Sequence, residues 1–265
     1  MLTVNELFSG IGAFRKALIN LGVPHEIVGI SEIDKYAIAS YEAMYGPARN
    51  YGDIAKVQKL DYADMWTYGF PCQDISSAGY QKGIVEGETR SGLLYEVKRL
   101  LEISRDANEL PKYLIMENVK ALISKKFKPD FDRWIEFLQD LGYRNYAKMM
   151  NAKDYGIPQH RERIFVVSIR KDIQKAFEFP QPVGEPPALV SYLEEEVDEK
   201  FYCKGHLVEK LNLERERERN NAPERGEGRH MPDNLREISD LECSELYADE
   251  IVWQNRSIEE VPPPK

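Results

Sequence analysis

Along residues 1–180, hydrophobic residues occur in short blocks of two kinds, which differ in their spacing. Short runs of mostly apolar or alternating residues predict β-strands, whereas apolar residues spaced three and four positions apart predict amphipathic helices. Strands and helices follow each other along this part of the chain, which is typical of an α/β protein. Strands are expected at residues 3–8, 27–31, 62–68, 112–116, 143–150 and 164–169, and helices at residues 13–21, 34–45, 91–101 and 131–141.

The pattern changes after residue 180, where four prolines within residues 180–187 indicate a boundary. Residues 189–200 are expected to form one short helix. The polar stretch at residues 213–234 has too few apolar residues to bury and is expected to be disordered. We therefore predict a large domain over residues 1–180 and a short irregular tail over residues 181–265.

Charge is unevenly divided between these two parts. The chain of 265 residues has a formal net charge of −9, but residues 1–180 hold 25 Lys and Arg against 24 Asp and Glu, whereas residues 181–265 hold 11 against 21. The acidity therefore belongs to the tail, and a nearly neutral body can still carry a basic face. A DNA or RNA partner is consistent with this division.

Hydrophobic runs along the chain all fall short of the roughly 20 residues of a membrane-spanning helix, and the first residues lack the pattern of a signal peptide. We therefore expect a cytoplasmic protein with no membrane partner. The three cysteines, Cys72, Cys203 and Cys243, lie far apart without paired ligand spacing. Neither a disulfide framework nor a metal site is expected from them.

Cys72 lies where the strand expected at residues 62–68 opens into a loop rich in serine and glycine. In α/β proteins, this end of a strand is where ligands and catalytic groups collect. A lone cysteine is also often a small apolar residue of a core. Cys72 is therefore a candidate nucleophile whose role depends on the groups brought to the same edge.

A tight turn with Gly10 and Gly12 separates the first expected strand from the first expected helix. Glycines there let the backbone approach a ligand, and the first amides of the helix are free to bind it. Glu32 ends the next strand about twenty residues later, where a carboxylate can accept hydrogen bonds from ribose hydroxyls. Asp53 could meet the amino group of an adenine, although each carboxylate alone is more often a helix cap or turn residue.

Glu117 and Asn118 follow the fourth expected strand, and a polar pair is unusual there unless that edge of the sheet is used. Arg161 and Arg163 precede the last expected strand, and their spacing of two places both side chains on one face. Such a pair suits an anionic or hydrogen-bonding ligand. It is equally typical of a solvated surface.

Six short blocks, taken in order, resemble the cytosine-5 DNA methyltransferase family. The blocks are Phe8–Gly12, Ser31–Asp34, Gly52–Ile54, Gly69–Gln73, Glu117–Val119 and Gln159–Arg163. The resemblance covers roughly residues 1–180 and implies a Rossmann-like methyltransferase fold, with a mixed but mostly parallel sheet and helices on both faces. It implies an enzyme that transfers a methyl group from S-adenosylmethionine to carbon 5 of cytosine in DNA.

The same resemblance assigns roles to residues of these blocks. The S-adenosylmethionine pocket would be lined by Phe8, Gly10, Gly12, Glu32, Ile33, Asp53, Ile54, Pro71 and Leu94. The cytosine would be met by Cys72, Glu117, Arg161 and Arg163, with Gln73 and Ser76 on the active-site loop.

In the implied reaction, the thiolate of Cys72 adds to carbon 6 of cytosine, which makes carbon 5 electron-rich. Glu117 would hydrogen-bond to or protonate ring nitrogen 3, and Arg161 and Arg163 would hold the ring oxygen and the thiolate environment. Loss of the carbon 5 proton after methyl transfer expels Cys72. The target base must leave the duplex, because its reacting atoms are inaccessible inside the stack.

The tail departs from the family pattern, because a target-recognition domain usually lies between the Gln159–Arg163 block and two late blocks. Here only residues 236–246 resemble the first late block, and the last block is absent or reduced to residues 254–264. Three interpretations remain: a complete small enzyme, the catalytic part of a split enzyme that needs a second polypeptide for target recognition, or a non-catalytic remnant that binds S-adenosylmethionine or DNA. The intact candidate catalytic residues argue against the remnant.

Overall fold

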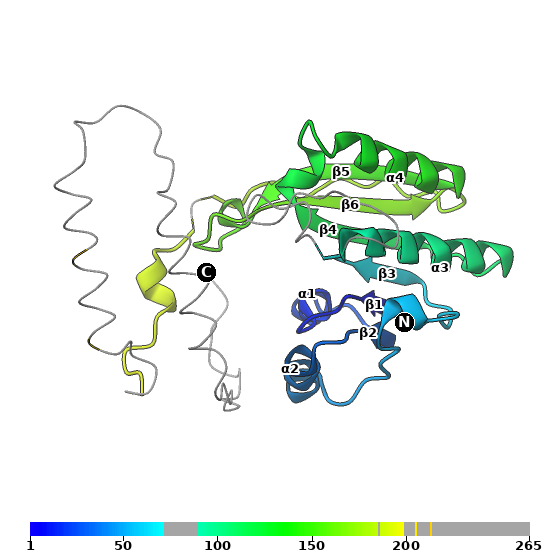
Figure 1. Cartoon of the computed structure of the whole chain (residues 1–265). Coiled ribbons are helices and arrows are strands. Elements are labelled where there is room, and N and C mark those ends of the chain that lie inside the picture. Colours follow the sequence, from blue (N-terminus) through cyan, green and yellow to red (C-terminus); the bar gives the residue numbers. More distant parts are fainter. Residues whose placement is uncertain (72–89, 185, 199–204, 206–212, 214–265) are drawn as a thin grey trace. The chain divides into compact units, whose positions relative to one another are not determined.

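The computed structural model describes residues 1–71, 90–184 and 186–198, together with Gly205 and Leu213. Met1–Leu193 forms one compact unit. Figure 1 shows a single twisted sheet in this unit, with helices beside it. None of the helices in the described part of the chain is long and apolar enough to cross a membrane.

The described strands form one six-stranded sheet in the order β2-β1-β3-β4-β6-β5. The strands β2, β1, β3 and β4 are mutually parallel, whereas β6 is antiparallel to both β4 and β5. The sheet is therefore mixed and mostly parallel, as expected, and β6 is the reversed strand among those that the structure describes. In chain order the strands are β1 (Leu2–Leu7), β2 (His25–Ser31), β3 (Met65–Tyr68), β4 (Tyr113–Val119), β5 (Tyr143–Asn151) and β6 (Glu162–Arg170).

Four α-helices connect these strands, and each begins where the sequence provides a local signal. The side chain of Asp34 caps α2 by accepting hydrogen bonds from the amides of Tyr36 and Ala37, and a proline lies in the first turn of α4. The helices are α1 (Ala13–Asn20), α2 (Lys35–Tyr45), α3 (Leu94–Asp106) and α4 (Lys128–Asp140). Short 3₁₀ turns lie at η1 (Ile54–Lys56), η2 (Arg90–Leu93), η3 (Lys120–Ile123), η4 (Ala152–Asp154) and η5 (Leu189–Tyr192).

Helices cover both faces of the sheet, as expected. Successive strand residues point to opposite faces. Leu7 of β1 belongs to the apolar cluster that includes the buried residues of α3 and α4, whereas its neighbour Glu6 contacts Tyr41 of α2 and the first turn of α1. The helices α1 and α2 therefore lie on the face opposite to α3 and α4.

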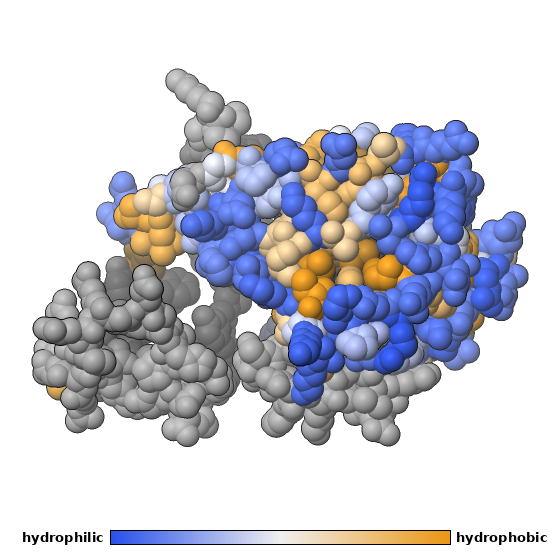
Figure 2. Space-filling model, turned by 90° about the horizontal axis from the view of Figure 1, so that it is seen from above, coloured by the Kyte–Doolittle hydropathy of each residue, from blue (hydrophilic) through white to orange (hydrophobic). Residues whose placement is uncertain are grey.

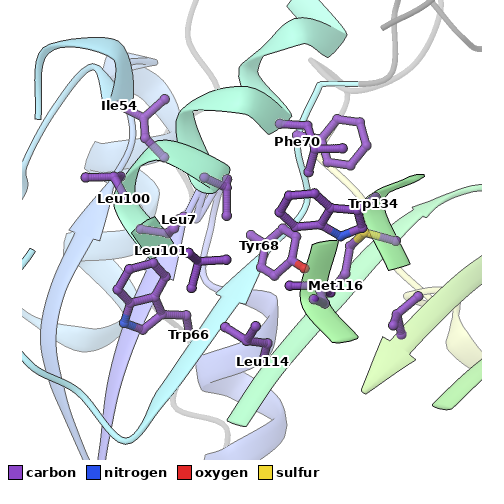
Figure 3. Close-up of a cluster of buried hydrophobic side chains, with 14 of the residues drawn as sticks. Leu7, Ile54, Trp66, Tyr68, Phe70, Leu100, Leu101, Leu114, Met116 and Trp134 are labelled. Atoms are coloured by element: carbon purple, nitrogen blue, oxygen red, sulfur yellow. The ribbon is translucent and has the colours of Figure 1, made fainter. Parts of the chain in front are cut away.

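The core lies between the sheet and the pair α3 and α4. Figure 3 shows its aromatic centre, where Trp66, Tyr68 and Trp134 lie among aliphatic side chains from β1, β4 and α3. The rings of Tyr68 and Trp134 meet edge to face with centroids 6.1 Å apart. Leu101 and Leu114 are fully buried beside them. This packing fixes β3 and β4 side by side, and both strands lead directly into the candidate site.

The strand β5 is an outer strand of the sheet, and it is only partly covered. Tyr146 of β5 packs on Phe177, with ring centroids 5.4 Å apart, and Phe177 packs in turn on Phe179. Figure 2 looks onto this side of the molecule and shows an apolar area bordered by hydrophilic residues. The segment after β6 thus supplies some of the apolar cover for the edge strand.

Three expectations from the sequence need correction. The strand expected at residues 62–68 begins only at Met65, because Tyr62 and Asp64 make side-chain hydrogen bonds instead. The strand expected to end at residue 116 continues to Val119. The helix expected at residues 189–200 is wrong for its described part, where only η5 forms, since Leu189, Val190 and Leu193 are exposed and no apolar face is buried to stabilise a helix.

Candidate active site at one edge of the sheet

All of the candidate residues that the structure describes lie in segments at the carboxyl-terminal edge of the sheet, which is the edge where the parallel strands end. The parallel strands β1, β2, β3 and β4 end at this edge, and β6 begins there because it runs in the opposite direction. The segments after Leu7, Ser31 and Tyr68 therefore lie at the same edge as Glu117 in β4 and Arg163 at the start of β6. The edge is where ligands bind in open α/β sheets.

The turn after β1 is held against the end of β2 by one carboxylate. Glu32 accepts hydrogen bonds from the backbone amide of Gly10 at 2.8 Å and from those of Ile33 and Asp34 at 2.8 and 2.9 Å. Gly10 adopts a left-handed backbone with φ of 54°, and a side chain there would meet nothing within 4 Å. The backbone of this turn is thus open to a ligand.

Asn50 joins the end of β2 to the segment that carries Asp53, and no signal in the sequence marked it as a site residue. Its side chain accepts from the amides of Glu32 and Gly52 and donates to the Glu32 carbonyl. Ser31 adds a hydrogen bond to the Gly52 carbonyl at 2.7 Å. An asparagine two residues before a glycine is an ordinary turn signal, so only the fold shows that it connects two candidate segments.

These segments fit a nucleoside-containing cofactor such as S-adenosylmethionine. The carboxylate of Glu32 has about four acceptor positions, and three are used by backbone amides, so one is left for a ribose hydroxyl. Ile33 follows the end of β2 and is 73% exposed. Its side chain is therefore available to pack on a flat base. Asp53 caps η1 through one oxygen and contacts Lys56 at 3.6 Å through the other.

Other residues of the expected cofactor pocket have different surroundings. The side chains of Ile54 and Leu94 are 3% and 5% exposed and belong to the core. Ile54 could therefore contribute only backbone atoms to a ligand site. Phe8 packs partly against the same core and has a left-handed backbone with φ of 54°, which bends the chain directly after β1. Pro71 is the last described residue before residues 72–89, which lie outside the described part of the chain.

A buried polar group lies beneath the glycine turn. Glu6 of β1 accepts a hydrogen bond from the hydroxyl of Tyr41 at 2.6 Å and another from the amide of Arg15 at 3.0 Å. Burial raises the pKa of the Glu6 carboxyl, although these hydrogen bonds oppose the rise. A side chain at Gly12 would lie within 2.8 Å of the rings of Tyr41 and Tyr45. The turn therefore rests directly on α2.

Glu117 and the two arginines form a compact charged group. The Glu117 Oε1 atom lies 3.1 Å from Nε of Arg163 and 3.5 Å from Nη2 of Arg161. Glu117 and Arg163 are each about three-quarters covered, whereas Arg161 is half exposed. Arg163 also donates to the Glu162 carbonyl at 2.8 Å, which fixes the orientation of its guanidinium group.

The chain passes Glu117 immediately before the candidate nucleophile. A side chain at Gly69 would lie 3.4 Å from the Glu117 carbonyl oxygen and 3.5 Å from its Oε2 atom. The buried side chain of Asn118 donates to the Phe70 carbonyl at 3.1 Å. The backbone is thereby held two residues before Cys72. Cys72, Gln73 and Ser76 lie outside the described residues.

Nearly the whole chain matches one protein family. The model described as "C-5 cytosine-specific DNA methylase" matches residues 2–257. The chain is 38% identical over 264 aligned residues to the type II methyltransferase M2.ScrFI of Lactococcus lactis subsp. cremoris, and the match covers 78% of this chain and 72% of that protein. It is 35% identical to the orphan methyltransferase M.Rho11sI of Bacillus phage rho11s, with 79% and 47% covered.

Solved structures show the same fold. A mutant DNMT2 from Spodoptera frugiperda superimposes with a TM-score of 0.65 at 22% identity, over 80% of this chain and 66% of that one. The chain thus spans about half of the length of M.Rho11sI and two-thirds of the length of this structural neighbour. At this identity, the structural likeness concerns the fold of the sheet and its helices alone.

Proposed function

Because the chain belongs to the C-5 cytosine-specific DNA methylase family, we propose that it transfers a methyl group from S-adenosylmethionine to carbon 5 of cytosine in DNA. The observation that supports this activity best is the group formed by Glu117, Arg161 and Arg163 beside the backbone that leads to Cys72. A carboxylate held by two guanidinium groups offers both a proton-exchanging group and donors for a ring oxygen. These are the functions that addition to a cytosine ring requires.

In the proposed reaction, Cys72 attacks carbon 6 of the flipped cytosine as a thiolate, and a carbon–sulfur bond forms. Negative charge develops on the ring, and the Glu117 carboxyl donates its proton to ring nitrogen 3, which neutralises that charge; the proton returns to Glu117 when the adduct breaks down. S-adenosylmethionine, held by the segments of Glu32, Ile33 and Asp53, would supply the methyl group to the electron pair at carbon 5, and the pair of the broken methyl–sulfur bond would stay on sulfur as S-adenosylhomocysteine leaves. Transfer of the carbon 5 proton to water restores the double bond and expels the thiolate of Cys72.

The geometry gives the arginines separate tasks in this proposal. Arg163 contacts Glu117 most closely and is itself held by the Glu162 carbonyl, so it orients the carboxylate. Arg161 is half exposed and contacts Glu117 at the longer distance of 3.5 Å. Arg161 is therefore the one that can turn toward the cytosine oxygen when the base enters. Both assignments place the positive charge where the negative charge of the adduct develops.

On the cofactor side, we assign Glu32 to a ribose hydroxyl, Asp53 to the adenine amino group and Ile33 to the face of the adenine ring. Glu32→Ala and Asp53→Ala should each weaken S-adenosylmethionine binding by roughly 1 to 3 kcal/mol, the usual range for an unmatched hydrogen-bonding partner. Glu32→Ala also removes acceptors from three backbone amides. Asp53→Asn is the cleaner variant, because it keeps an oxygen that can cap η1. Unchanged affinity in calorimetry would contradict the assignment.

The covalent step is tested with duplex DNA that contains 5-fluorocytosine, in the presence of S-adenosylmethionine. Fluorine at carbon 5 cannot leave as a proton does, so the adduct to Cys72 should accumulate and be visible as a covalent complex in denaturing electrophoresis. Cys72→Ser should form no adduct, because a hydroxyl is a much weaker nucleophile at neutral pH. Cys203→Ser is the matched control and should be trapped normally. A wild-type protein that methylates DNA without forming the adduct would exclude this mechanism.

We also propose that a second polypeptide supplies target recognition. Residues 181–265 hold 11 Lys and Arg against 21 Asp and Glu, and this acidic composition is repelled by DNA phosphates. Specific recognition normally needs about 1,000 Å² or more of protein surface with side chains held at base edges. Methylation mapping of plasmid DNA treated with this chain alone should show low sequence selectivity. High occupancy confined to one short motif would refute this second proposal and leave the first intact.

A further inference from the structure

The side chain and the backbone of Arg161 are held by different contacts. The guanidinium group is 47% exposed and reaches Glu117 only at 3.5 Å. Arg161 also lies one residue before β6 begins, beyond the last paired residues of β5 and β6, which are Asn151 and Glu162. The place from which this side chain starts therefore depends on contacts outside the two strands.

Two hydrogen bonds hold the backbone of Arg161 to the end of β5. Its amide donates to the side-chain Oδ1 atom of Asn151 at 3.1 Å. Its carbonyl accepts from the amide of Ala152 at 3.0 Å. The second bond joins backbone atoms and is open to almost any residue at position 152, whereas the first needs an acceptor in the side chain of residue 151. Asn151 is thus the part of this hold that depends on residue type.

Asn151 makes a further hydrogen bond that fixes its own side chain. The same Oδ1 atom accepts from the amide of Lys153 at 3.2 Å and so caps the start of η4. Asparagine suits this place because its short side chain reaches a backbone amide two residues later. One oxygen atom therefore starts the turn and closes the base of the loop that leads from β5 to Arg161.

The far part of this loop is held by residues after β6. The amide of Val183 donates to the Asp154 carbonyl at 2.9 Å, and the hydroxyl of Tyr192 donates to the Gly156 carbonyl at 3.0 Å. These contacts do not involve Asn151. Removal of the Asn151 side chain should therefore loosen the base of the loop while its far part keeps its place.

We propose that Asn151 is a positioning residue for methyl transfer and that it acts through Arg161. By fixing the backbone of Arg161, it keeps the guanidinium group within reach of Glu117 and of the oxygen of an entering cytosine. A donor that starts from a fixed place needs less rearrangement when charge develops on the ring. This inference rests on the proposed function for the role of Arg161, and it adds a residue that lies outside the six sequence blocks.

The first experiment is a double-mutant cycle in the full chain, with kcat measured on duplex DNA. Arg161→Ala should reduce kcat by roughly 100-fold, as the loss of one donor to a developing oxyanion does. Asn151→Ala should reduce kcat by about 10-fold, because the guanidinium group is present but less well placed. The double variant should lie within about twofold of Arg161→Ala, since Asn151 then has nothing left to position. S-adenosylmethionine affinity should stay the same throughout.

A conservative variant and a control complete the cycle. Asn151→Asp keeps an oxygen that can accept from both amides, so it should restore kcat to within about threefold of the wild type. Asn145→Ala is the matched control, because this asparagine lies near the start of the same strand and donates to the Ile135 carbonyl of α4 at 3.4 Å. It should leave kcat unchanged. Additive losses in the double variant, or no recovery in Asn151→Asp, would overturn the inference.

Hydrogen exchange of the backbone amides tests the hold on Arg161 without any need for activity. Mass spectrometry of peptides that cover residues 159–163 compares the wild type with the two variants of Asn151. The Arg161 amide should exchange about fivefold faster in Asn151→Ala, which removes its acceptor, and at the wild-type rate in Asn151→Asp. An unchanged rate in Asn151→Ala would overturn the inference whatever the kinetics show.

Failure of this inference and failure of the proposed function give different results. If the wild type neither methylates DNA nor forms the 5-fluorocytosine adduct, the proposed function fails, and the positioning role of Asn151 fails with it. If the wild type is active and Asn151→Ala is equally active, the function stands and the positioning role alone fails.

Discussion

The side-chain amide of Asn118 donates to the carbonyl of Phe70 at 3.1 Å, and both residues are 2% exposed. The other atom of the same side-chain amide, Oδ1, accepts from the amide of Val119 at 2.8 Å. One buried side chain therefore joins the end of β4 to the backbone that leads into Cys72. The proposed nucleophile Cys72 follows β3, whereas Glu117 lies in β4, and this hydrogen bond fixes the spacing between the ends of the two strands.

Asn118→Ala should lower the free energy of unfolding by about 1 to 3 kcal/mol, because a buried carbonyl and a buried amide lose their partner. We also expect a lower kcat with nearly unchanged S-adenosylmethionine affinity, since the segments that carry Cys72 and Glu117 are no longer held together. Denaturant titration and steady-state kinetics measure the two effects. Asn20→Ala, at an exposed position in α1, should change stability by less than about 0.5 kcal/mol. Equal effects in both variants would contradict the role of this hydrogen bond.

Glu117→Gln should reduce kcat by roughly 100-fold or more, because the amide cannot exchange a proton with ring nitrogen 3. S-adenosylmethionine affinity measured by calorimetry should stay the same, since Glu117 is on the substrate side of the edge. Arg163→Lys keeps the charge but loses the planar group that contacts both Glu117 and the Glu162 carbonyl. It should also reduce kcat. Full activity in both variants would show that this charged group is structural.

Tyr41→Phe removes the hydroxyl that donates to the buried Glu6 at 2.6 Å. The carboxylate is then left with fewer donors, so we expect a loss of about 1 to 3 kcal/mol in unfolding free energy. Weaker S-adenosylmethionine binding should accompany it, because Glu6 also holds the amide of Arg15 in the first turn of α1, directly after the glycine turn. Tyr45→Phe is the matched control, since its hydroxyl donates to the Gly12 carbonyl at 3.1 Å in a less buried place. A larger effect from Tyr45→Phe would contradict this account.

Asp64 predicts a pH dependence of stability. The ammonium of Lys112 at 2.7 Å, with hydrogen bonds from the amide and hydroxyl of Thr3, lowers the pKa of Asp64 from 3.8 to about 2. Because the folded pKa is the lower one, this stabilisation is present above the unfolded pKa and is lost as the pH falls through about 2. Asp64→Asn should therefore cost about 1 to 2 kcal/mol near neutral pH, after an allowance for solvent screening.

The check is a series of unfolding free energies measured from neutral to acid pH. The difference between the wild type and Asp64→Asn should shrink as the pH falls toward the folded pKa of Asp64. Asp106→Asn, which alters an exposed residue at the end of α3, should show no such trend. A constant difference across the range would mean that Asp64 acts through packing and not through its charge.

The sequence predicted the strands and helices of residues 1–170 well, because each is marked by a strong local pattern. Gly10, Glu32 and Glu117 were recognised because each is a polar or flexible residue placed directly after an apolar strand. Their convergence follows from the rule that parallel strands end at one edge. Local patterns were thus enough to predict which residue types meet at this edge.

The supporting contacts could not be predicted in the same way. Asn50 and Asn118 act through hydrogen bonds to backbone atoms 18 and 48 positions away, and these depend on the alignment of distant strands. The contact of both arginines with Glu117 depends on the reversed direction of β6, which the residues of that strand do not encode locally. The expected helix at residues 189–200 failed because local propensity does not form a helix without a surface to pack on.

The position of the turn between α3 and β4 also determines how the chain could be divided. The turn at Ala107–Asn108, between α3 and β4, lies at the edge opposite to the candidate site. A break at Asn108 would leave Cys72 and the carboxylates proposed to bind the cofactor in one polypeptide and place Glu117, Arg161 and Arg163 in the other. Neither piece would hold a complete set of reacting groups. Methylation would then require the two polypeptides to associate. Methylated cytosine in DNA would show that they had done so.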